Sequence, residues 1–535
     1  MAHILSLPQE IQIRIFTHLD HVSLLRSAST CRLYYQTCKE SLELQYIIEL
    51  SMKGMDDAGS RFSRADILSR LGGLHGAWDA LDWKRLTTFS IRDDDDDSSL
   101  MYDLAAGVFA SSDHHGLQLL RLPSPTLDNR PLKRQRHSLG VPIKDFTIDP
   151  TQDVIAILEN DHYPISITHG RDVRVHLKSI SLNDYHPLAA HGVLTFAITP
   201  DAGSGMHIPS CSLQFAEDVL GIFLRKGRLG PSGKSRVLLW NWREGTLLYD
   251  SNHSVTKLPH HFQDFGLLSR NSFVVTVTHE SGVVVLYKFS SSVPDPTLPL
   301  SPPTVAVTLS LPSILAHCYL LNFTIHSGPI LGAPPQDSLF LTTPDSRIQA
   351  ISLLYAEGNN SSPLAVSYWL FVHTRLLLDY IRRHESGPEG SSDSEIVVEW
   401  ESWGEMNARF ILDEPVPEWL KYVHGQRVVF QSSRSIYVDV LDFNANANRQ
   451  PSDRPSASTF TSDFRSSDSH RRTCSDPTLI SAGSLFQRDV ITRLPYRMTT
   501  RSVGQRYFAL MIDQEHLIGL KMGNGNGMEL DAYSF

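Results

Sequence analysis

The sequence has 535 residues, of which 41% are hydrophobic and 9% aromatic, so it can form sizeable cores in roughly two to four domains. Its formal net charge of −10 argues against a general nucleic-acid-binding protein, which would carry a basic surface. The five cysteines are scattered and form no CxxC pair, so we expect neither a disulfide framework nor a zinc site, and no other cofactor is indicated.

The N-terminal residues lack the basic start and the long apolar stretch of a signal peptide. Nowhere does an apolar run approach the roughly 18 residues that a membrane-spanning helix needs. We therefore expect a protein of the cytoplasm or the nucleus that binds neither membranes nor nucleic acids.

The first 41 residues have a helical pattern with more apolar positions than one buried face requires. The stretch SLPQEIQIRIFTHLD opens with Pro8, which suits the first turn of a helix. Four apolar side chains recur at i, i+4 spacing and form one row along it: Leu7, Ile11, Ile15 and Leu19. Ile13 and Phe16 fall outside this row. A helix with two apolar faces must bury both, so one face needs a neighbour that this chain need not supply.

Helical patterning continues over residues 42–92, which we interpret as a helical linker or stalk. A second helix in the head is predicted to begin at an N-cap formed by Ser23, and Ser63 is predicted to cap a helix of the stalk. The phrase LHGAWDALDWKRL closes the region and offers Trp78, Leu81 and Trp83 for packing. The acidic run that follows is interpreted as a solvated loop at the domain boundary.

Beyond Leu100 the pattern becomes short apolar strands separated by turns, without helical crossovers of about 10–15 residues. The phrases FTIDPTQDVIAIL, LQFAEDVLGIFL and FQDFGLLSRNSFVVTV share one plan: an aromatic strand, an acidic turn and a buried strand. The second phrase is followed by a strand that ends in Trp240 and Trp242, which resembles a degenerate WD-type repeat. Repeated units of four short strands are typical of a β-propeller, and six to eight blades would suit the length.

We therefore predict an all-α head followed by an all-β body over residues 98–530. A β-propeller is favoured, and a sandwich or a double barrel is the alternative. Residues 444–479 are rich in Ser, Asp, Arg and Pro, so we predict that they form a disordered insertion within the body.

The other motifs in the sequence do not indicate a catalytic or ligand-binding site. The stretch GRLGPSGKS approaches a phosphate-binding loop, but Arg228 stands where the pattern requires glycine, and two strands flank it instead of a strand and a helix. The basic cluster from Lys133 to Arg136 is either a nuclear import signal or a solvated loop between strands. We found no marked catalytic residue and no metal-ligating set.

An ordered run of residues in the head meets one known family pattern. It comprises Leu7, Pro8, Glu10, Ile11, Ile15, Phe16, Leu19, Leu24, Leu25, Arg26, Ser29, Cys31, Arg32 and Tyr34. This run resembles an F-box. The departures are mild: the family usually has proline at the position of His21, an acidic cap at that of Ser23 and tryptophan at that of Tyr34. The rest of the chain resembles large fungal F-box families more loosely.

The resemblance implies that the head docks on the Skp-type adaptor of an SCF ubiquitin ligase, and through it on the cullin and RING subunits. Nine residues are implied in adaptor binding: Leu7, Pro8, Ile11, Ile15, Phe16, Leu19, Leu24, Leu25 and Cys31. The body would bind an unknown target protein. The chain itself need not be catalytic, because holding a target near the E2 subunit makes ubiquitin transfer effectively intramolecular.

Three alternatives stay open at this level. The chain could be an adaptor-bound scaffold outside a ligase. It could also be a propeller enzyme with an appended F-box, which would have clustered acids at one mouth of the body. Finally, the head could be a self-contained bundle whose extra apolar face packs on Trp78 and Trp83.

Overall fold

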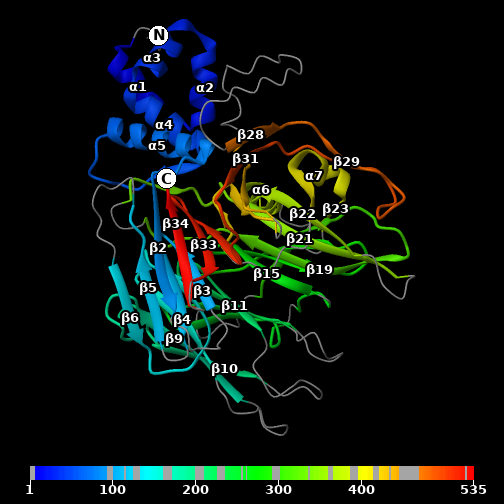
Figure 1. Cartoon of the computed structure of the whole chain (residues 1–535). Coiled ribbons are helices and arrows are strands. Elements are labelled where there is room, and N and C mark those ends of the chain that lie inside the picture. Colours follow the sequence, from blue (N-terminus) through cyan, green and yellow to red (C-terminus); the bar gives the residue numbers. More distant parts are fainter. Residues whose placement is uncertain are drawn as a thin grey trace.

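The computed structural model of the chain shows a helical head standing on a large body of strands (Figure 1). The residues that it describes are 7–92, 101–113, 116–124, 133–160, 171–198, 210–225, 235–254, 257–260, 262–291, 302–334, 338–358, 365–385, 396–413, 421–432, 435–444, 469–523 and 527–535. The acidic run at residues 93–97 and most of the loop GRLGPSGKS, residues 227–234, lie outside these ranges.

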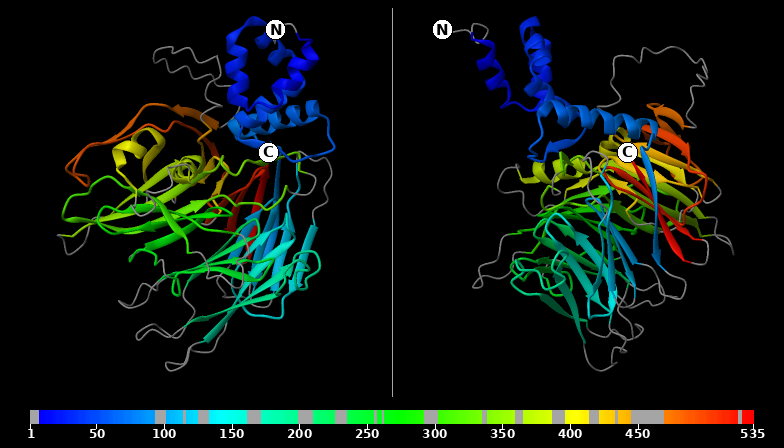
Figure 2. Two further views of the ribbon diagram at one scale, coloured as in Figure 1. Left: turned by 180° about the vertical axis from the view of Figure 1, so that it is seen from behind. Right: turned by 60° about the vertical axis from the view of Figure 1, so that its left-hand side comes forward.

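The head and the stalk are mainly helical, as predicted. The head contains α1 (Gln9–Phe16), α2 (His21–Thr30), α3 (Arg32–Glu40) and α4 (Leu42–Met52). A short strand, β1 (Met55–Asp57), and the long helix α5 (Arg64–Ala80) follow. Figure 2 shows α5 lying across the body, with the other helices projecting away from it.

Within the described ranges the body consists of seven sheets of four or five strands, and it is a seven-bladed β-propeller. Blade 1 is β3-β4-β5-β6 (Met101–Ala105, Val108–Asp113, Gly116–Arg121, Lys133–Ser138). Blade 2 is β7-β8-β9-β10 (Ile143–Asp149, Val154–Glu159, Arg171–Ser179, Val193–Ile198). Blade 3 is β11-β12-β13-β14 (Cys211–Ala216, Val219–Leu224, Arg236–Asn241, Thr246–Asp250).

The later blades carry additions to this plan. Blade 4 is β15-β16-β17-β18 (Phe262–Ser269, Ser272–Val277, Val283–Lys288, Thr304–Ser310), extended by β23 (Val397–Val398). Blade 5 is β19-β21-β22-β24 (Cys318–Ser327, Ile348–Glu357, Ala365–His373, Ala408–Asp413). Blade 6 is β25-β26-β27-β31 (Val423–His424, Arg427–Phe430, Tyr437–Asp442, Tyr496–Ser502), extended by β28 (Ser469–Cys474). Blade 7 is β32-β33-β34-β2 (Ala509–Ile512, His516–Met522, Met528–Ser534, Arg85–Arg92).

The first strands of successive blades contact one another around a central axis, from β3 through β7, β11, β15, β19 and β25 to β32. Because each blade is covered by its two neighbours, middle strands such as β12 and β16 have every residue buried. This explains the continuous apolar runs that the sequence shows. The prediction of a β-propeller is confirmed, and seven blades fall within the predicted range of six to eight.

The repeated phrases of the sequence are equivalent parts of three blades. They form the hairpins β7–β8, β11–β12 and β15–β16, the first hairpins of blades 2, 3 and 4. Trp242 is fully buried in the apolar cluster between blades 2 and 3, where its ring contacts that of His186 edge-on at 5.0 Å. Its Nε1 donates to the Glu217 carbonyl at 3.0 Å, which ties the turn between β13 and β14 to the turn between β11 and β12 of the same blade.

The boundary between stalk and body differs from the prediction. Residues 85–92, assigned to the helical stalk, form strand β2, which pairs antiparallel with β34 from the other end of the chain. In Figure 1 the blue β2 and the red β34 lie side by side. The stalk therefore ends before Arg85, and blade 7 is closed by strands from both ends of the chain, including residues beyond 530. No local pattern reveals such a long-range pairing.

Blade 5 contains a helical insertion that the sequence analysis missed. Between β22 and β24 lie α6 (Thr374–Glu385) and α7 (Trp400–Asn407), although no helix was expected in the body. Both helices pack on the apolar cluster that joins blades 4 and 5. They are an addition to the blade and not a crossover, because β22 and β24 still pair antiparallel.

Two loop predictions also need correction. Lys133 to Arg136 belong to strand β6, paired with β5, and not to a loop. In the predicted insertion 444–479, residues 445–468 lie outside the described ranges, but its later part is ordered in strands. There β28 pairs with β31, and β29 (Thr478–Ile480) pairs with β30 (Val490–Thr492). The buried Arg409 holds this part through hydrogen bonds to the carbonyls of Asp476 and Cys474.

Candidate functional site

The helical head has a small apolar core of its own. Phe16 of α1, Leu24 of α2, Cys38 of α3 and Leu44 of α4 are buried together. The Phe16 ring meets the Tyr34 ring edge-on, with the centroids 5.0 Å apart. Each helix thus contributes one inward face, which accounts for one of the two apolar faces of the first helix.

The other apolar face of α1 is open to solvent. Ile11 and Ile15, one turn apart, are 44% and 38% exposed, and Leu25 of α2 is 44% exposed. Large aliphatic side chains exposed in this number on a small head make this face a candidate contact surface. We call Ile11, Ile15 and Leu25 the exposed aliphatic set.

The nine predicted adaptor-binding residues divide between the two faces. Pro8, Ile11, Ile15 and Leu25 are exposed, and Leu7, Leu19 and Cys31 are half-buried. Phe16 and Leu24 are buried, with 3% and 0% of their surface exposed. These two residues shape the surface from beneath, because the packed core leaves them no surface to offer a partner.

The prediction omitted four further apolar residues that the head exposes: Val22, Leu33, Tyr35 and Leu42. Val22 and Leu25 lie three residues apart on α2 and so share one side of that helix. The same helical spacing could have identified Val22 from the sequence.

The start of α2 also differs from the prediction. Its N-cap is Asp20, whose Oδ1 accepts a hydrogen bond from the Ser23 backbone N–H at 2.7 Å. This hydrogen bond lowers the pKa of the Asp20 carboxyl. The acidic cap that seemed to be missing at Ser23 is therefore present three residues earlier. The predicted cap at Ser63 is confirmed, since its Oγ accepts from the Asp66 N–H at 3.1 Å.

The stalk joins the head to the propeller through an aromatic contact. Trp78 of α5 is buried and stacks on Phe535 at a centroid distance of 3.8 Å. Its Nε1 donates to the Gln514 carbonyl at 2.9 Å. The guanidinium of Arg427, from blade 6, lies 5.1 Å from the Trp78 ring centroid. Trp78 therefore packs on the propeller and not on α1, which removes the alternative of a self-contained bundle.

Polar contacts reinforce this junction. Arg427 donates to Nδ1 of the buried His75 at 3.0 Å. Burial, together with the positive charge of Arg427, holds the pKa of His75 well below its usual range, so the ring is a neutral acceptor. Asp79 accepts from Arg497 at 2.6 Å, and β1 pairs with β20 (Phe340–Thr342) of the body. Head, stalk and propeller are thus one packed unit.

Comparison with protein families adds to this geometry. A family model described as F-box-like matches residues 4–44, the segment that holds α1, α2 and α3. The head is an F-box-like domain. The exposed aliphatic set lies within the matched residues of this F-box-like domain, and the propeller lies entirely outside them.

Several solved structures match this chain at low similarity. Hsv2p of Kluyveromyces lactis is 9% identical, with a TM-score of 0.27, over 64% of this chain and 93% of its own. The WD40 β-propeller domain of Doa1 is 10% identical, with a TM-score of 0.24, over 54% of this chain and 82% of its own. The Nup133 β-propeller domain of Vanderwaltozyma polyspora is 8% identical, with a TM-score of 0.26, over 84% of this chain and 98% of its own.

A search of curated protein sequences found no match. The blade number and the order of the domains follow from the sheets of this chain. Within the described ranges, none of the helices combines the length and hydrophobicity that a bilayer span requires. All five cysteines have free thiols, and the described residues hold no group of three His, Cys, Asp or Glu side chains arranged for a metal.

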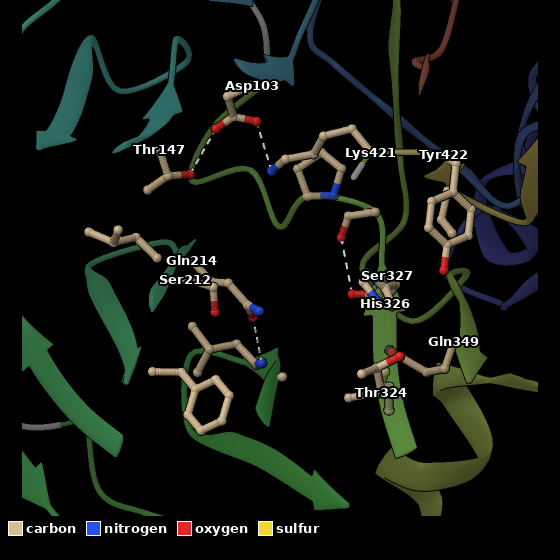
Figure 3. Close-up of a pocket in the computed structure, with 18 of the residues that line it drawn as sticks. Asp103, Thr147, Ser212, Gln214, Thr324, His326, Ser327, Gln349, Lys421 and Tyr422 are labelled. Atoms are coloured by element: carbon tan, nitrogen blue, oxygen red, sulfur yellow. Dashed lines mark hydrogen bonds and ion pairs between the residues drawn. The ribbon is translucent and has the colours of Figure 1, made fainter. Parts of the chain in front are cut away.

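The propeller encloses a cavity of about 510 Å³ along its axis. Its walls come from the first strands β3, β7, β11, β15 and β19, from the inner half of blade 5, and from the residues around Lys421. Figure 3 shows Asp103, Thr147 and Lys421 at one end, and Ser212 and Gln214 facing Thr324, His326 and Gln349 across the space. The volume lies in the range of roughly 300–1,000 Å³ that is usual for ligand sites.

Proposed function

We propose that this chain is the substrate-recognition subunit of an SCF-type ubiquitin ligase. In this proposal the F-box-like domain binds the Skp-type adaptor, and through it the cullin and RING subunits, while the propeller binds the target protein. The observation that supports it most is the exposed aliphatic set on a head whose core is already complete without it.

The chemistry of ubiquitin transfer would belong to the partner subunits. The contribution of this chain is distance and orientation: it holds a target near the E2 subunit, which makes the transfer effectively intramolecular. A packed junction between head and propeller suits this role, because a flexible junction would let the bound target adopt many positions relative to the E2 subunit. Such a complex would work in the cytoplasm or the nucleus.

A binding experiment with purified proteins tests the proposal. The double change Ile11→Asp and Ile15→Asp puts two charges into the aliphatic face while leaving the head core intact. Interface anchors contribute on the order of 1–3 kcal/mol each, so we expect at least a roughly 30-fold loss of affinity for the Skp-type adaptor. Calorimetric titration of the adaptor into wild type and variant measures it.

The matched control changes two aliphatic residues of the propeller that are at least as exposed. Leu182→Asp and Leu188→Asp likewise replace two exposed aliphatic side chains by carboxylates, on the loop after β9. They should leave the affinity for the adaptor unchanged. Equal binding by wild type and the Ile11/Ile15 variant, or no binding by wild type, would refute the proposal. Helical circular dichroism of both variants must match that of wild type.

A further inference from the structure

The carboxyl groups along the central cavity are not equivalent. Each oxygen of Asp103 already accepts two hydrogen bonds: Oδ1 from Leu104 N–H and Lys421 Nζ, and Oδ2 from Thr147 Oγ1 and Ile148 N–H, all at 2.7–3.0 Å. Through these four hydrogen bonds the Asp103 carboxylate links β3, β7 and Lys421 in the wall of the cavity. It has little capacity left for a ligand.

Both carboxylate oxygens of Asp149 also accept hydrogen bonds within the protein. Its Oδ1 accepts from the backbone and hydroxyl of Thr151, and its Oδ2 accepts from Gln152 Nε2 at 2.8 Å and Gly332 N–H at 3.0 Å. It fixes the turn after β7 against the segment that follows β19. Asp103 and Asp149 are therefore structural.

Asp145, on β7 in the cavity wall, is different. One oxygen accepts from the Phe146 N–H at 2.8 Å. Among the described residues, the other oxygen accepts a hydrogen bond only from the Cys211 thiol, at 3.7 Å, and a thiol is a weak donor. This carboxyl can accept further strong hydrogen bonds.

The basic groups of the cavity are already paired. Lys421 lies 2.8 Å from Asp103, and Arg225 lies 3.2 Å from Asp264. The charges of Lys421 and Arg225 are therefore neutralised by their carboxylate partners. These two residues would not repel a cation that approached the Asp145 carboxyl. The other titratable side chains of the wall, besides the carboxylates, are Cys211, His326, Tyr102 and Tyr422.

The rest of the wall suits an elongated side chain with an apolar stem. Trp369, Tyr422 and Phe430 line one side of the cavity, with ring centroids 5.4–6.0 Å apart. Ring faces attract cations, and apolar walls accept the methylene stems of lysine and arginine. The hydroxyl and amide groups of Ser212, Gln214 and Thr324 add hydrogen-bonding positions (Figure 3).

We propose that the central channel binds a basic side chain of the target protein, with its ammonium or guanidinium group against the Asp145 carboxyl. This inference rests on the proposed function of the propeller as the target-binding part, and it specifies the chemistry that is recognised: a lysine or arginine inserted into the channel from a bound polypeptide.

The protonation of Asp145 makes the inference measurable. Burial, together with the negative charge of Asp103, raises the pKa of this carboxyl to about 7, against the opposing effects of the Phe146 and Cys211 hydrogen bonds and of the Lys421 charge. A bound cation needs the ionised form. The fraction ionised rises about tenfold between pH 6 and pH 8, so binding should tighten by about that factor.

The binding test uses the free chain and capped tripeptides, titrated at pH 6 and pH 8. Acetyl-Gly-Arg-Gly-amide and its lysine analogue should bind, about tenfold tighter at pH 8, and the norleucine analogue should not. Absence of binding, equal binding of the norleucine peptide, or no pH dependence would overturn the proposal. Butylguanidinium carries the same single cation on an alkyl stem without a peptide; if it bound as tightly, the cavity would be a site for small cations instead.

Asp145→Asn should abolish binding of the basic peptides and make the protein more stable at pH 8. The buried carboxyl has a pKa above that of the unfolded chain, so the folded state loses stability as pH rises from about 4 to 7, and the amide removes this loss. The melting temperature should therefore be higher than that of wild type at pH 8 and equal at pH 4. A lower melting temperature at pH 8 would show a structural role and overturn the proposal.

A matched control is Asp439→Asn on β27, outside the cavity wall. Burial also raises the pKa of Asp439, against a hydrogen bond from Thr500, so its amide variant changes the same kind of group. It should keep peptide binding. These peptide assays omit the adaptor, so the two proposals can fail separately. If the peptides do not bind but wild type still binds the adaptor, only the proposed basic-side-chain site is refuted. If the peptides bind but wild type does not bind the adaptor, only the proposed ligase function is refuted.

Discussion

His516, at the start of β33, is held as an imidazolium by its neighbours. Its Nδ1 lies 3.0 Å from an Asp513 oxygen, and its Nε2 lies 2.9 Å from the Pro123 carbonyl. Both partners are acceptors, so both ring nitrogens must donate, which requires the charged form. The contact with Pro123 joins blade 7 to the segment that follows β5 in blade 1, where the propeller closes.

This arrangement predicts a loss of stability at alkaline pH. Burial alone would lower the pKa of His516, but the charge and hydrogen bond of Asp513 raise it to about 9. A raised folded-state pKa gives stability that is fully present below the unfolded value of about 6.5 and is lost as pH rises through about 9. The loss amounts to about 3 kcal/mol, at about 1.4 kcal/mol per pH unit.

Denaturant unfolding of wild type and His516→Gln at pH 6 and pH 9.5 measures this effect. We expect wild type to lose about 3 kcal/mol more than the variant over this interval. Parallel pH dependences of the two proteins would show that His516 is neutral in the folded state and would contradict this interpretation.

At the residue scale the sequence predicts which side chains are apolar but not which face each one serves. Leu24 and Leu25 are adjacent and chemically identical, yet the first is in the head core and the second in the exposed aliphatic set. The family pattern includes both. Only the packing of α3 and α4 against α2 separates a core position from a contact position, and that packing is not local information.

At the scale of elements, α5 belongs to the propeller as much as to the head. Ile67, Leu71 and Trp78 of α5 share one apolar cluster with residues of blades 5, 6 and 7. The head core around Phe16 and Leu24 is a separate cluster. We therefore expect damage to α5 to destabilise the propeller and to leave the fold of the head intact.

Trp78→Ala tests this expectation. Truncation of a buried tryptophan costs about 3–5 kcal/mol, and here it also leaves the Gln514 carbonyl without its donor. We expect a clear drop in the melting temperature of the propeller, with adaptor affinity preserved. Phe62→Ala, an exposed aromatic just before α5, is the control and should change stability by less than about 0.5 kcal/mol. Equal melting of the two variants would show that α5 is only a tether.

Elements were predictable from the sequence where their signals are local. The first hairpins of blades 2, 3 and 4 repeat one phrase, and the Ser63 cap precedes its helix directly. Two features depend on distant partners and were missed. β2 is a strand because β34 lies beside it, and α6 is stable on the surface that blades 4 and 5 provide.

At the scale of the whole molecule, the fold separates two surfaces. The F-box-like domain presents its aliphatic face at one end, and the propeller carries an axial cavity with polar and aromatic walls in its centre (Figures 1 and 3). The packed junction at Trp78 fixes the distance between them. A receptor that must bring a target to a separate enzyme has use for this combination of two sites and one rigid connection.

Quantitative affinity capture of the full chain from cells tests the central claim most directly. The adaptor and the cullin should both be recovered with wild type, in similar amounts, and both should be lost with the Ile11→Asp and Ile15→Asp variant. Recovery of the adaptor without the cullin would identify an adaptor-bound scaffold outside a ligase. That result, or equal recovery of cullin with wild type and variant, would contradict the account.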